Sequence, residues 1–340
     1  MARRLPTIRD VAAQAGVSVG TASKALNNQG RISTETRSAV LRAAEELRFA
    51  PNALIRSLQR GRTGTVGLLT WPVRETGILS VDLALLTGVS HGLAAVQTDM
   101  LLYARCPGRE LTTILLDGRV DGAILVPHEL DEATLGSLAS AGLPTVALYQ
   151  AEVPQGMGYV KVDNGSGMRQ AVAHLVARGH KRIAYYSPLS SADFRERCAG
   201  YKEACRELGA STRVELCVTP ADYHAPLLPT WESWCALDEP PTALIVGNDG
   251  FAMKWLEFLE TQQVSVPQQL SLVGFDDAPI ASTGVGLTTV RQPGLQVGEL
   301  AAAFVDRLIQ GAPADECRRT LPVELVVRGT TGPPSLEGRR

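Results

Sequence analysis

The chain has 340 residues, 45% of them hydrophobic, and a formal net charge of −2 at pH 7. This length supports two or three compact units with cores of their own. No apolar run reaches the roughly 18 residues of a membrane-spanning helix. The basic start, Met1 to Arg4, is not followed by an apolar stretch, so we expect no signal peptide. The six cysteines show no C-x-x-C spacing, which favours reduced thiols, no metal or cofactor, and a cytoplasmic location.

The charge is unevenly distributed along the chain. Residues 1–62 contain 11 Lys/Arg and 4 Asp/Glu, a net charge of +7. Subtraction from the totals of 33 and 35 leaves 22 and 31 for the remainder, a net charge of −9. A small basic module joined to an acidic body is typical of a protein whose terminal module binds nucleic acid.

Residues 7–27 predict two short helices joined by a tight turn. Thr7 and Asp10 have capping-box spacing, and a glycine at position 16 permits the turn. Ser18 is a suitable cap for a second helix over residues 19–26. Two such helices form a helix-turn-helix, whose second helix can lie in the DNA major groove. The same pattern also occurs as an ordinary helical hairpin within a larger core.

A third helix is expected from Ser33 to about Phe49, where a proline at position 51 ends it. Residues 52–58 offer one or two further helical turns, and residues 59–64 are typical of a polar linker. A helix as short as 52–58 is marginal alone. We therefore expect it to fold only with DNA and a partner hinge present.

Beyond the linker, apolar runs alternate with longer amphipathic stretches. The expected strands are 66–69, 100–103, 122–126, 145–148, 159–162, 183–186, 214–218, 243–246 and 270–275. The expected helices are 81–96, 109–117, 133–141, 168–178, 195–208 and 251–261. This alternation predicts parallel sheets covered by helices on both faces. This number of strands is larger than one hydrophobic core accommodates, and we therefore expect two similar α/β subdomains.

Polar side chains follow several of these strands, at the edge where open parallel sheets bind ligands. They are Asp163, Asn164, Arg195, Arg197, Tyr223, Asn248, Asp249, Asp276 and Asp277. Carboxylates, amides and guanidinium groups beside an aromatic ring suit a polyhydroxylated ligand. Other interpretations stay open: Asp163, Asp249 and Asp277 can simply cap the following helices, and Arg195 can form a surface ion pair.

Two long runs carry a resemblance to a known family. GVSVGTASKALN (16–27) followed by TRSAVLRAAEELRFAPNALIRSL (36–58) resembles the DNA-binding headpiece and hinge of the lactose-repressor (LacI) family of bacterial transcription regulators. Five further blocks, GHKRIAYY, RERCAGY, PTALIVGND, LSLVGFDD and LTTVRQP, resemble the effector domain of that family, which is similar to periplasmic sugar-binding proteins.

The resemblance implies an α/β protein with an all-α helix-turn-helix headpiece at residues 1–50 and a hinge helix and linker at 51–63. An effector-binding and dimerisation domain of two parallel-sheet subdomains would occupy 64–330, and a tail 331–340. The N-subdomain would comprise about 64–162 plus 292–318, and the C-subdomain about 163–291 plus 319–330.

The resemblance also implies DNA-contacting residues. Val19, Gly20 and Lys24 stand at the family's base-reading positions; a lysine can donate to guanine O6 and N7, and a valine can touch a thymine methyl group. Leu58 matches the hinge leucine that wedges into the minor groove, although it can also be an ordinary core residue. The predicted DNA-binding set is Thr7, Ser18, Val19, Gly20, Thr21, Ser23, Lys24, Asn27, Asn52 and Leu58. Its remaining polar members are expected to contact phosphates or to fix the helix.

For the effector, Arg197, Asn248 and Asp276 stand at ligand-contacting positions of the family. The chain departs from the family after the first strand, where many members carry an Asn-Pro-Phe-Phe-like stretch and this sequence has LSVD at 79–82. Asp82 can recognise a hydroxyl group there or can be a plain helix-start charge. The predicted effector set is Asp82, Asp163, Arg197, Tyr223, Asn248 and Asp276.

We therefore expect a ligand-responsive repressor of carbohydrate uptake or catabolism genes that binds palindromic operator DNA as a homodimer, with a sugar or sugar derivative as effector. Ligand binding would reorient the subdomains and so the hinges. The alternative is a regulator that senses a nucleobase or nucleoside. An enzyme on the same scaffold is disfavoured because the sequence has no GxxxxGK[ST], no GxGxxG after a strand and no GxSxG.

Overall fold

The computed structural model describes residues 6–27, 29–49, 61–70, 82–104, 110–126, 132–150, 152–221, 224–284 and 286–335. The chain forms two compact units, Met1–Thr63 and Gly64–Arg340. Within the described ranges, no helix has both the length and the apolarity needed to cross a membrane.

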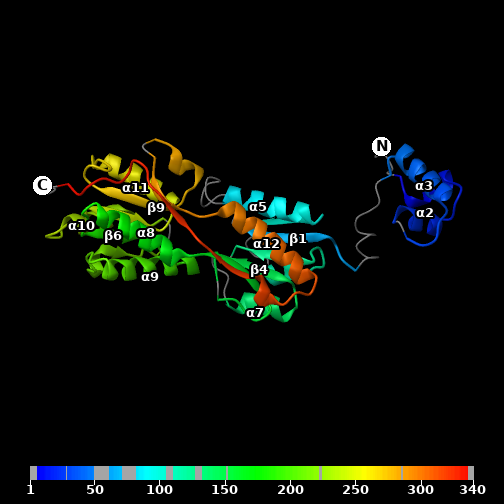
Figure 1. The fold of residues 1–340 in the computed structure, drawn as a ribbon, viewed down its shortest axis with the longest axis horizontal. Coiled ribbons are helices and arrows are strands. Elements are labelled where there is room, and N and C mark those ends of the chain that lie inside the picture. The colour runs from blue at the N-terminus through cyan, green and yellow to red at the C-terminus, as the bar shows by residue number, and fades with distance from the viewer. Residues whose placement is uncertain are drawn as a thin grey trace. The chain divides into compact units, whose positions relative to one another are not determined.

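The described residues of the first unit form three helices, α1 (Ile8–Gln14), α2 (Val19–Leu26) and α3 (Thr34–Glu46) (Figure 1). The Ser18 and Ser33 hydroxyls each accept a hydrogen bond from the backbone N–H three residues later, at 3.1 and 3.2 Å, and so cap α2 and α3. The Asp10 carboxylate accepts from both the backbone N–H and the hydroxyl of Thr7, at 2.7 Å each. The predicted helix-turn-helix is confirmed, and α3 ends three residues before the expected Phe49.

The first sheet of the second unit is entirely parallel, in the order β11-β5-β4-β3-β1-β2. Its strands are β1 (Thr65–Thr70), β2 (Asp99–Ala104), β3 (Gly122–Leu125), β4 (Thr145–Leu148), β5 (Gly158–Val162) and β11 (Arg318–Leu321). Two helices, α5 (Asp82–Ala95) and α12 (Gly294–Ile309), pack on one face. The short α6 (Leu111–Leu115) and α7 (Glu132–Ser140) cover the other face.

The second sheet has the order β12-β10-β9-β8-β6-β7. Its strands are β6 (Ile183–Tyr186), β7 (Cys217–Val218), β8 (Ala243–Val246), β9 (Ser271–Asp276), β10 (Thr288–Arg291) and β12 (Glu324–Val326). One face packs against α8 (Asn164–Ala177) and α9 (Ala192–Glu207), and the other against α10 (Leu228–Cys235) and α11 (Asp249–Thr261). Three short 3₁₀ turns are also present in the described part of the chain: η1 (Val214–Leu216), η2 (Pro279–Ser282) and η3 (Ala314–Cys317).

The second sheet corrects two expectations. The strand expected at 214–218 is reduced to two residues because η1 takes up its first half. The sheet is not wholly parallel, since β12 pairs antiparallel with β10. β12 enters the second sheet directly from β11 of the first sheet, after only two residues, and not through a crossover helix that packs on the second sheet.

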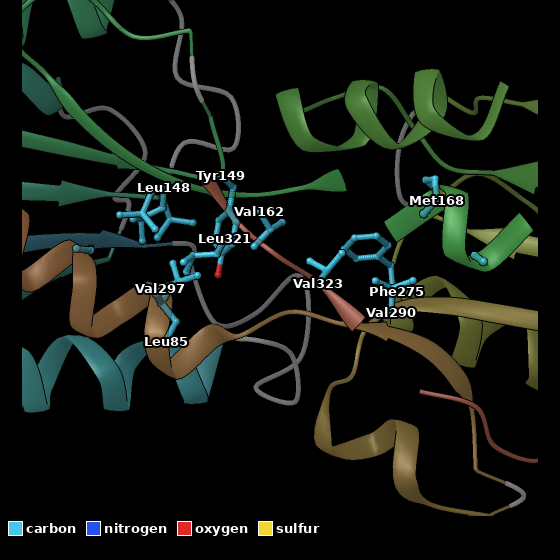
Figure 2. Packing of buried hydrophobic residues seen from close by; sticks show 14 of the residues in the cluster. Leu85, Leu148, Tyr149, Val162, Met168, Phe275, Val290, Val297, Leu321 and Val323 are labelled. Carbon is cyan, nitrogen blue, oxygen red and sulfur yellow. The ribbon is translucent and has the colours of Figure 1, made fainter. Parts of the chain in front are cut away.

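The chain passes between the two sheets through three crossover segments, at residue 163, at residues 292–293 and at residues 322–323. The sequence predicted that the chain returns to the second subdomain at residue 319. Residues 318–321 instead pair with β5 in the first sheet, so the return comes at residues 322–323. A buried apolar cluster continues across these segments, from Val162 and Leu321 to Val323, Phe275 and Met168 (Figure 2). The two subdomains therefore share packed side chains where the chain crosses.

Glycines allow α5 and α12 to approach closely. A Cβ atom on Gly88 would lie 2.1 Å from the carbonyl oxygen of Leu295, and one on Gly298 would lie 2.4 Å from that of Leu85. Both obstacles are backbone atoms, which cannot rotate away as the end of a side chain can. The closeness of these two helices therefore depends on the absent side chains.

We expect Gly298→Ala to lower the free energy of unfolding by about 1–3 kcal/mol, because the steric clash outweighs the better helix propensity of alanine. Gly136→Ala in α7 is the matched control, since nothing lies within 4 Å of its added Cβ. The control should be neutral or slightly stabilising. Urea unfolding of the full chain measures both, and equal stability of the two variants would contradict the packing argument.

Two histidines hold the C-terminal segment against the second sheet. His174 Nε2 lies 2.9 Å from Thr331 Oγ1, and His180 Nε2 donates to the Gly332 carbonyl at 2.9 Å. Burial lowers the pKa of His174 to about 4, with Arg178 contributing, and burial likewise lowers the pKa of His180. The fold thus favours both rings in the neutral form.

These shifts predict a pH dependence of stability. The folded pKa values lie below the value of about 6.5 of an unfolded histidine. The neutral rings therefore contribute fully above about pH 6.5, and their contribution decreases as the pH falls toward 4. The free energy of unfolding of His174→Gln should consequently fall less between pH 7 and pH 5 than that of the wild type. Parallel urea titrations at the two pH values test this, and identical decreases would refute it.

Candidate DNA-binding and effector sites

The helix α2 separates its residues into two faces. Ala22 and Ala25 are buried in the headpiece core with Val11 and Val40. Gly20 and Lys24 are exposed, and Val19 is 44% exposed although it is apolar. The predicted base-reading residues therefore all lie on the solvent side of α2, while its small residues pack inward.

Some of the other predicted DNA-binding residues use their hydroxyl groups in contacts within helix caps. The Thr21 hydroxyl lies 2.9 Å from that of Ser18, and the Thr7 hydroxyl donates to Asp10. Ser23 and Asn27 are half-buried. Asn52 and Leu58, the predicted hinge contacts, lie outside the described residues.

The second candidate site is built around Arg197 on α9, which is only 2% exposed. Its Nε donates to Asn164 Oδ1 at 2.9 Å, and its Nη1 donates to the Gly247 carbonyl at 2.6 Å. Its Nη2 lies 3.3 Å from a carboxylate oxygen of Asp193, one turn earlier on α9. The guanidinium also stacks on the Phe275 ring, 3.7 Å from the centroid.

Asp276 ends β9 and faces this guanidinium. Its Oδ1 lies 3.6 Å from Arg197 Nη1 and accepts a hydrogen bond from Gln292 Nε2 at 2.6 Å. Asp276 has a φ of 128°, in the region that favours glycine, and is 8% exposed. Burial raises the pKa of Asp276 well above its ordinary range, and the neighbouring Arg197 opposes that rise.

Two adjacent residues after β8 have different roles. Asn248 is half-buried, and its Oδ1 accepts from the Phe251 N–H at 2.8 Å, so it caps α11. The Asp249 carboxylate accepts from Thr289 Oγ1 at 2.6 Å and from the Ala278 N–H at 2.8 Å. Burial raises the pKa of Asp249 to about 7. Asp249 is therefore not the cap of this helix, and it ties the loops after β8 and β9 to β10.

Asp163, Arg195 and Asp277 lie around this cluster. Asp163 is exposed and caps α8 by accepting from the Ser166 N–H at 2.9 Å. Asp277 caps no helix, because its carboxylate pairs with Arg291 at 2.7 Å and with Arg328 at 2.6 Å. Arg195 is exposed and donates to the Leu189 carbonyl at 3.2 Å.

The structure thus brings Arg197, Asp276 and the Asn248 loop together at the carboxyl ends of β8 and β9. It adds Gln292, which was not predicted although it also follows a strand end, that of β10. Tyr223 and the side chain of Asp82 lie outside the described residues. Among the residues that are described, no group of three His, Cys, Asp or Glu side chains could hold a metal ion.

Both parts of the chain match known protein families. Residues 7–52 match the family described as bacterial regulatory proteins, lacI family, and residues 172–331 match a periplasmic binding protein-like domain. The regulator CelR of Thermobifida fusca is 33% identical over 344 residues, covering 96% of this chain and 98% of CelR. The ribose operon repressor of Halalkalibacterium halodurans is 31% identical over 334 residues, covering 96% and 97%.

Two solved structures share the fold along nearly the whole chain. A complex of the regulator CelR with cellobiose has a TM-score of 0.72 at 28% identity and covers 96% of this chain and 99% of its own. A lac repressor dimer bound to operator and the anti-inducer ONPF has a TM-score of 0.82 at 25% identity and covers 97% and 100%. The chain therefore belongs to the lacI family of bacterial regulatory proteins, and it is a DNA-binding transcriptional regulator rather than an enzyme.

Proposed function

We propose that this regulator represses genes of carbohydrate uptake or catabolism in the bacterial cytoplasm, where it binds a palindromic operator as a homodimer and releases or retains it according to a sugar effector. Residues 1–50 would read the DNA, 51–63 would form hinge and linker, 64–330 would bind the effector and dimerise, and 331–340 would be a tail. The relatives named for cellobiose and ribose support a carbohydrate.

The observation that carries the effector proposal is the spacing between Arg197 and Asp276. At 3.6 Å, their closest nitrogen and oxygen are farther apart than the 2.7–2.9 Å typical of a charge-assisted hydrogen bond. Both groups therefore keep hydrogen-bonding capacity toward a third partner. A sugar hydroxyl can donate to the carboxylate and accept from the guanidinium at once, which a purely donating or accepting group cannot do.

The surroundings of this pair favour selection for hydroxyl groups. Arg197 and Asp276 are held by Asn164, the Gly247 carbonyl and Gln292, so neither side chain has to be ordered when a ligand binds. The low exposure of both groups strengthens their hydrogen bonds relative to those at an exposed surface. A ligand without a matching hydroxyl would leave them poorly satisfied, which is costly.

The proposed contact of the headpiece with DNA rests on the exposed face of α2. Lys24 is exposed and, within the described part of the chain, makes no ion pair that would hold it away from a base. Val19 presents an apolar surface next to it that can cover a thymine methyl group. Phosphate contacts from the other basic residues of the unit would position this face.

Lys24→Ala tests base reading. We expect it to relax the preference at one base pair of each half-site by about 1–3 kcal/mol if its contact to guanine is bidentate. Operators selected from random DNA, and their single-base variants, are titrated by fluorescence anisotropy. The exposed Lys181→Ala in the second unit controls for loss of one charge. A uniform loss across all sequences would make Lys24 a phosphate contact instead.

Asp276→Asn tests the effector site. Asparagine tolerates positive φ and keeps the shape, but it loses charge-assisted bonds worth about 1.5–3 kcal/mol. Effector affinity should therefore fall roughly tenfold to a hundredfold, whereas operator binding without effector should persist. Calorimetry against cellobiose, ribose, other mono- and disaccharides and purine nucleosides identifies the effector and measures the loss.

The neighbouring Asp277→Asn is the control for this experiment, because Asp277 pairs with Arg291 and Arg328 and not with Arg197. It should retain effector affinity within a few-fold. Equal affinities of wild type and Asp276→Asn would place the effector elsewhere on the protein. Binding of a purine nucleoside and of no sugar would overturn the carbohydrate proposal.

A further inference from the structure

Two cysteines from separate elements meet on the outer side of the second subdomain. Cys198 lies on α9, and Cys217 forms the edge strand β7 with Val218. Their sulfur atoms are 3.7 Å apart. Cys198 is 4% exposed, whereas Cys217 is half-buried and opens the pair to solvent. All five cysteines of the described residues are free thiols, and this is the pair whose sulfurs the structure places in contact.

The surroundings make one of these thiols acidic. The pKa of Cys198 is lowered to about 6, first by the hydrogen bond from Cys217 and then by the ammonium of Lys202, one helical turn further along α9. The thiolate, not the thiol, is the reactive form. Cys205, on the same helix, provides a contrast, because burial raises its pKa to about 11. The surroundings therefore favour the thiolate form of Cys198 and disfavour that of Cys205.

We propose that Cys198 and Cys217 are a redox-sensitive thiol pair, which a peroxide oxidises to an intramolecular disulfide. The Cys198 thiolate attacks one peroxide oxygen, the O–O bond breaks, and a sulfenic acid and hydroxide form. The Cys217 sulfur then attacks the Cys198 sulfur, its proton passes to the leaving hydroxyl, and water departs as the S–S bond forms. Two thiols are oxidised by two electrons and one peroxide is reduced to two waters.

The geometry permits this bond with a small movement. A disulfide is about 2.05 Å long, so the sulfurs have to approach by about 1.7 Å from 3.7 Å. The strand β7 is only two residues long and pairs on one side only, with β6. An edge of this kind can shift more easily than a central strand. The new bond would fix α9 to this edge.

The consequence for regulation follows from chain position and rests on the proposed function. Cys198 directly follows Arg197, so a bond that fixes α9 against β7 acts on the residue that organises the effector cluster. Oxidation of the cysteine pair would therefore be a second regulatory signal, separate from effector binding. Its chemistry can be tested without any effector or operator.

The test uses the full chain with Cys106→Ser and Cys235→Ser, since Cys235 is exposed and could link two molecules. The protein is treated with hydrogen peroxide at pH 7, alkylated, digested and analysed by mass spectrometry. A cross-linked peptide pair containing Cys198 and Cys217 is expected, and dithiothreitol should remove it. Cys217→Ser should instead accumulate a sulfenic acid at Cys198 that dimedone traps. Cys205→Ser should leave the cross-link unchanged.

Lys202→Met tests the role of the ammonium. It should slow cross-linking several-fold at pH 7 and much less at pH 9, where a larger fraction of thiol is ionised in both proteins. Three results would overturn the proposal: no cross-link at peroxide levels that oxidise Cys198, a cross-link that requires Cys205, or a rate at pH 7 that does not depend on Lys202. A failure here leaves the effector and operator experiments intact, because the readout is sulfur chemistry alone.

Discussion

The second unit is organised around one buried cation, the guanidinium of Arg197. A guanidinium inside a protein is costly unless it is paired and hydrogen-bonded. Arg197 meets this requirement with partners from four places: Asn164 at the start of α8, Asp193 on its own helix, the Gly247 carbonyl after β8, and Asp276 at the end of β9. One side chain therefore sets the relative positions of four segments that lie up to 112 residues apart in sequence (Asn164 to Asp276). Losing any partner would leave charge or polar groups unsatisfied.

The same network reaches the crossover segments. Glu196 accepts from Asn164 Nδ2 at 2.9 Å and pairs with Lys161, which lies on β5 of the first sheet, at 2.5 Å. On the other side, Gln292 in the second crossover segment holds Asp276. A ligand that changes the Arg197–Asp276 pair therefore acts on groups already connected to both sheets. Differential contacts of this kind are what a ligand needs in order to shift the balance between two arrangements of subdomains.

The rigid and adjustable parts of the molecule are built differently. The helices α5 and α12 pack backbone against backbone at Gly88 and Gly298. This close packing limits how far the two helices can move relative to each other. The edge strand β7, in contrast, is short and carries the Cys198–Cys217 contact at the end of the second sheet. The first unit has a core of its own around Val11 and Val40, and this core holds α2 with Val19, Gly20 and Lys24 exposed.

The amino-acid sequence alone determined most of the helices and strands, because those signals are local. The helices α10 and α12 and the strands β10, β11 and β12 were not among the expected elements. The Ser18 and Ser33 caps act over three residues, and buried strands such as Ile183–Tyr186 are continuous apolar runs. The family blocks also located Arg197, Asn248 and Asp276, although their ligand contacts stay predictions. Asp163 could be recognised as a helix cap for the same local reason.

Only the tertiary structure decided which partners those residues take. Gln292 donates a hydrogen bond to Asp276, which lies 16 residues earlier in the sequence. Thr289 donates one to the carboxylate of Asp249, which lies 40 residues earlier. The antiparallel pairing of β12 with β10 and the return of the chain to the second sheet at residues 322–323 likewise depend on the pairing of β11 with β5. The Cys198–Cys217 contact was invisible in the spacing of the cysteines. Such pairs are selected by packing and by the need to satisfy buried polar groups, and neither leaves a local pattern in the sequence.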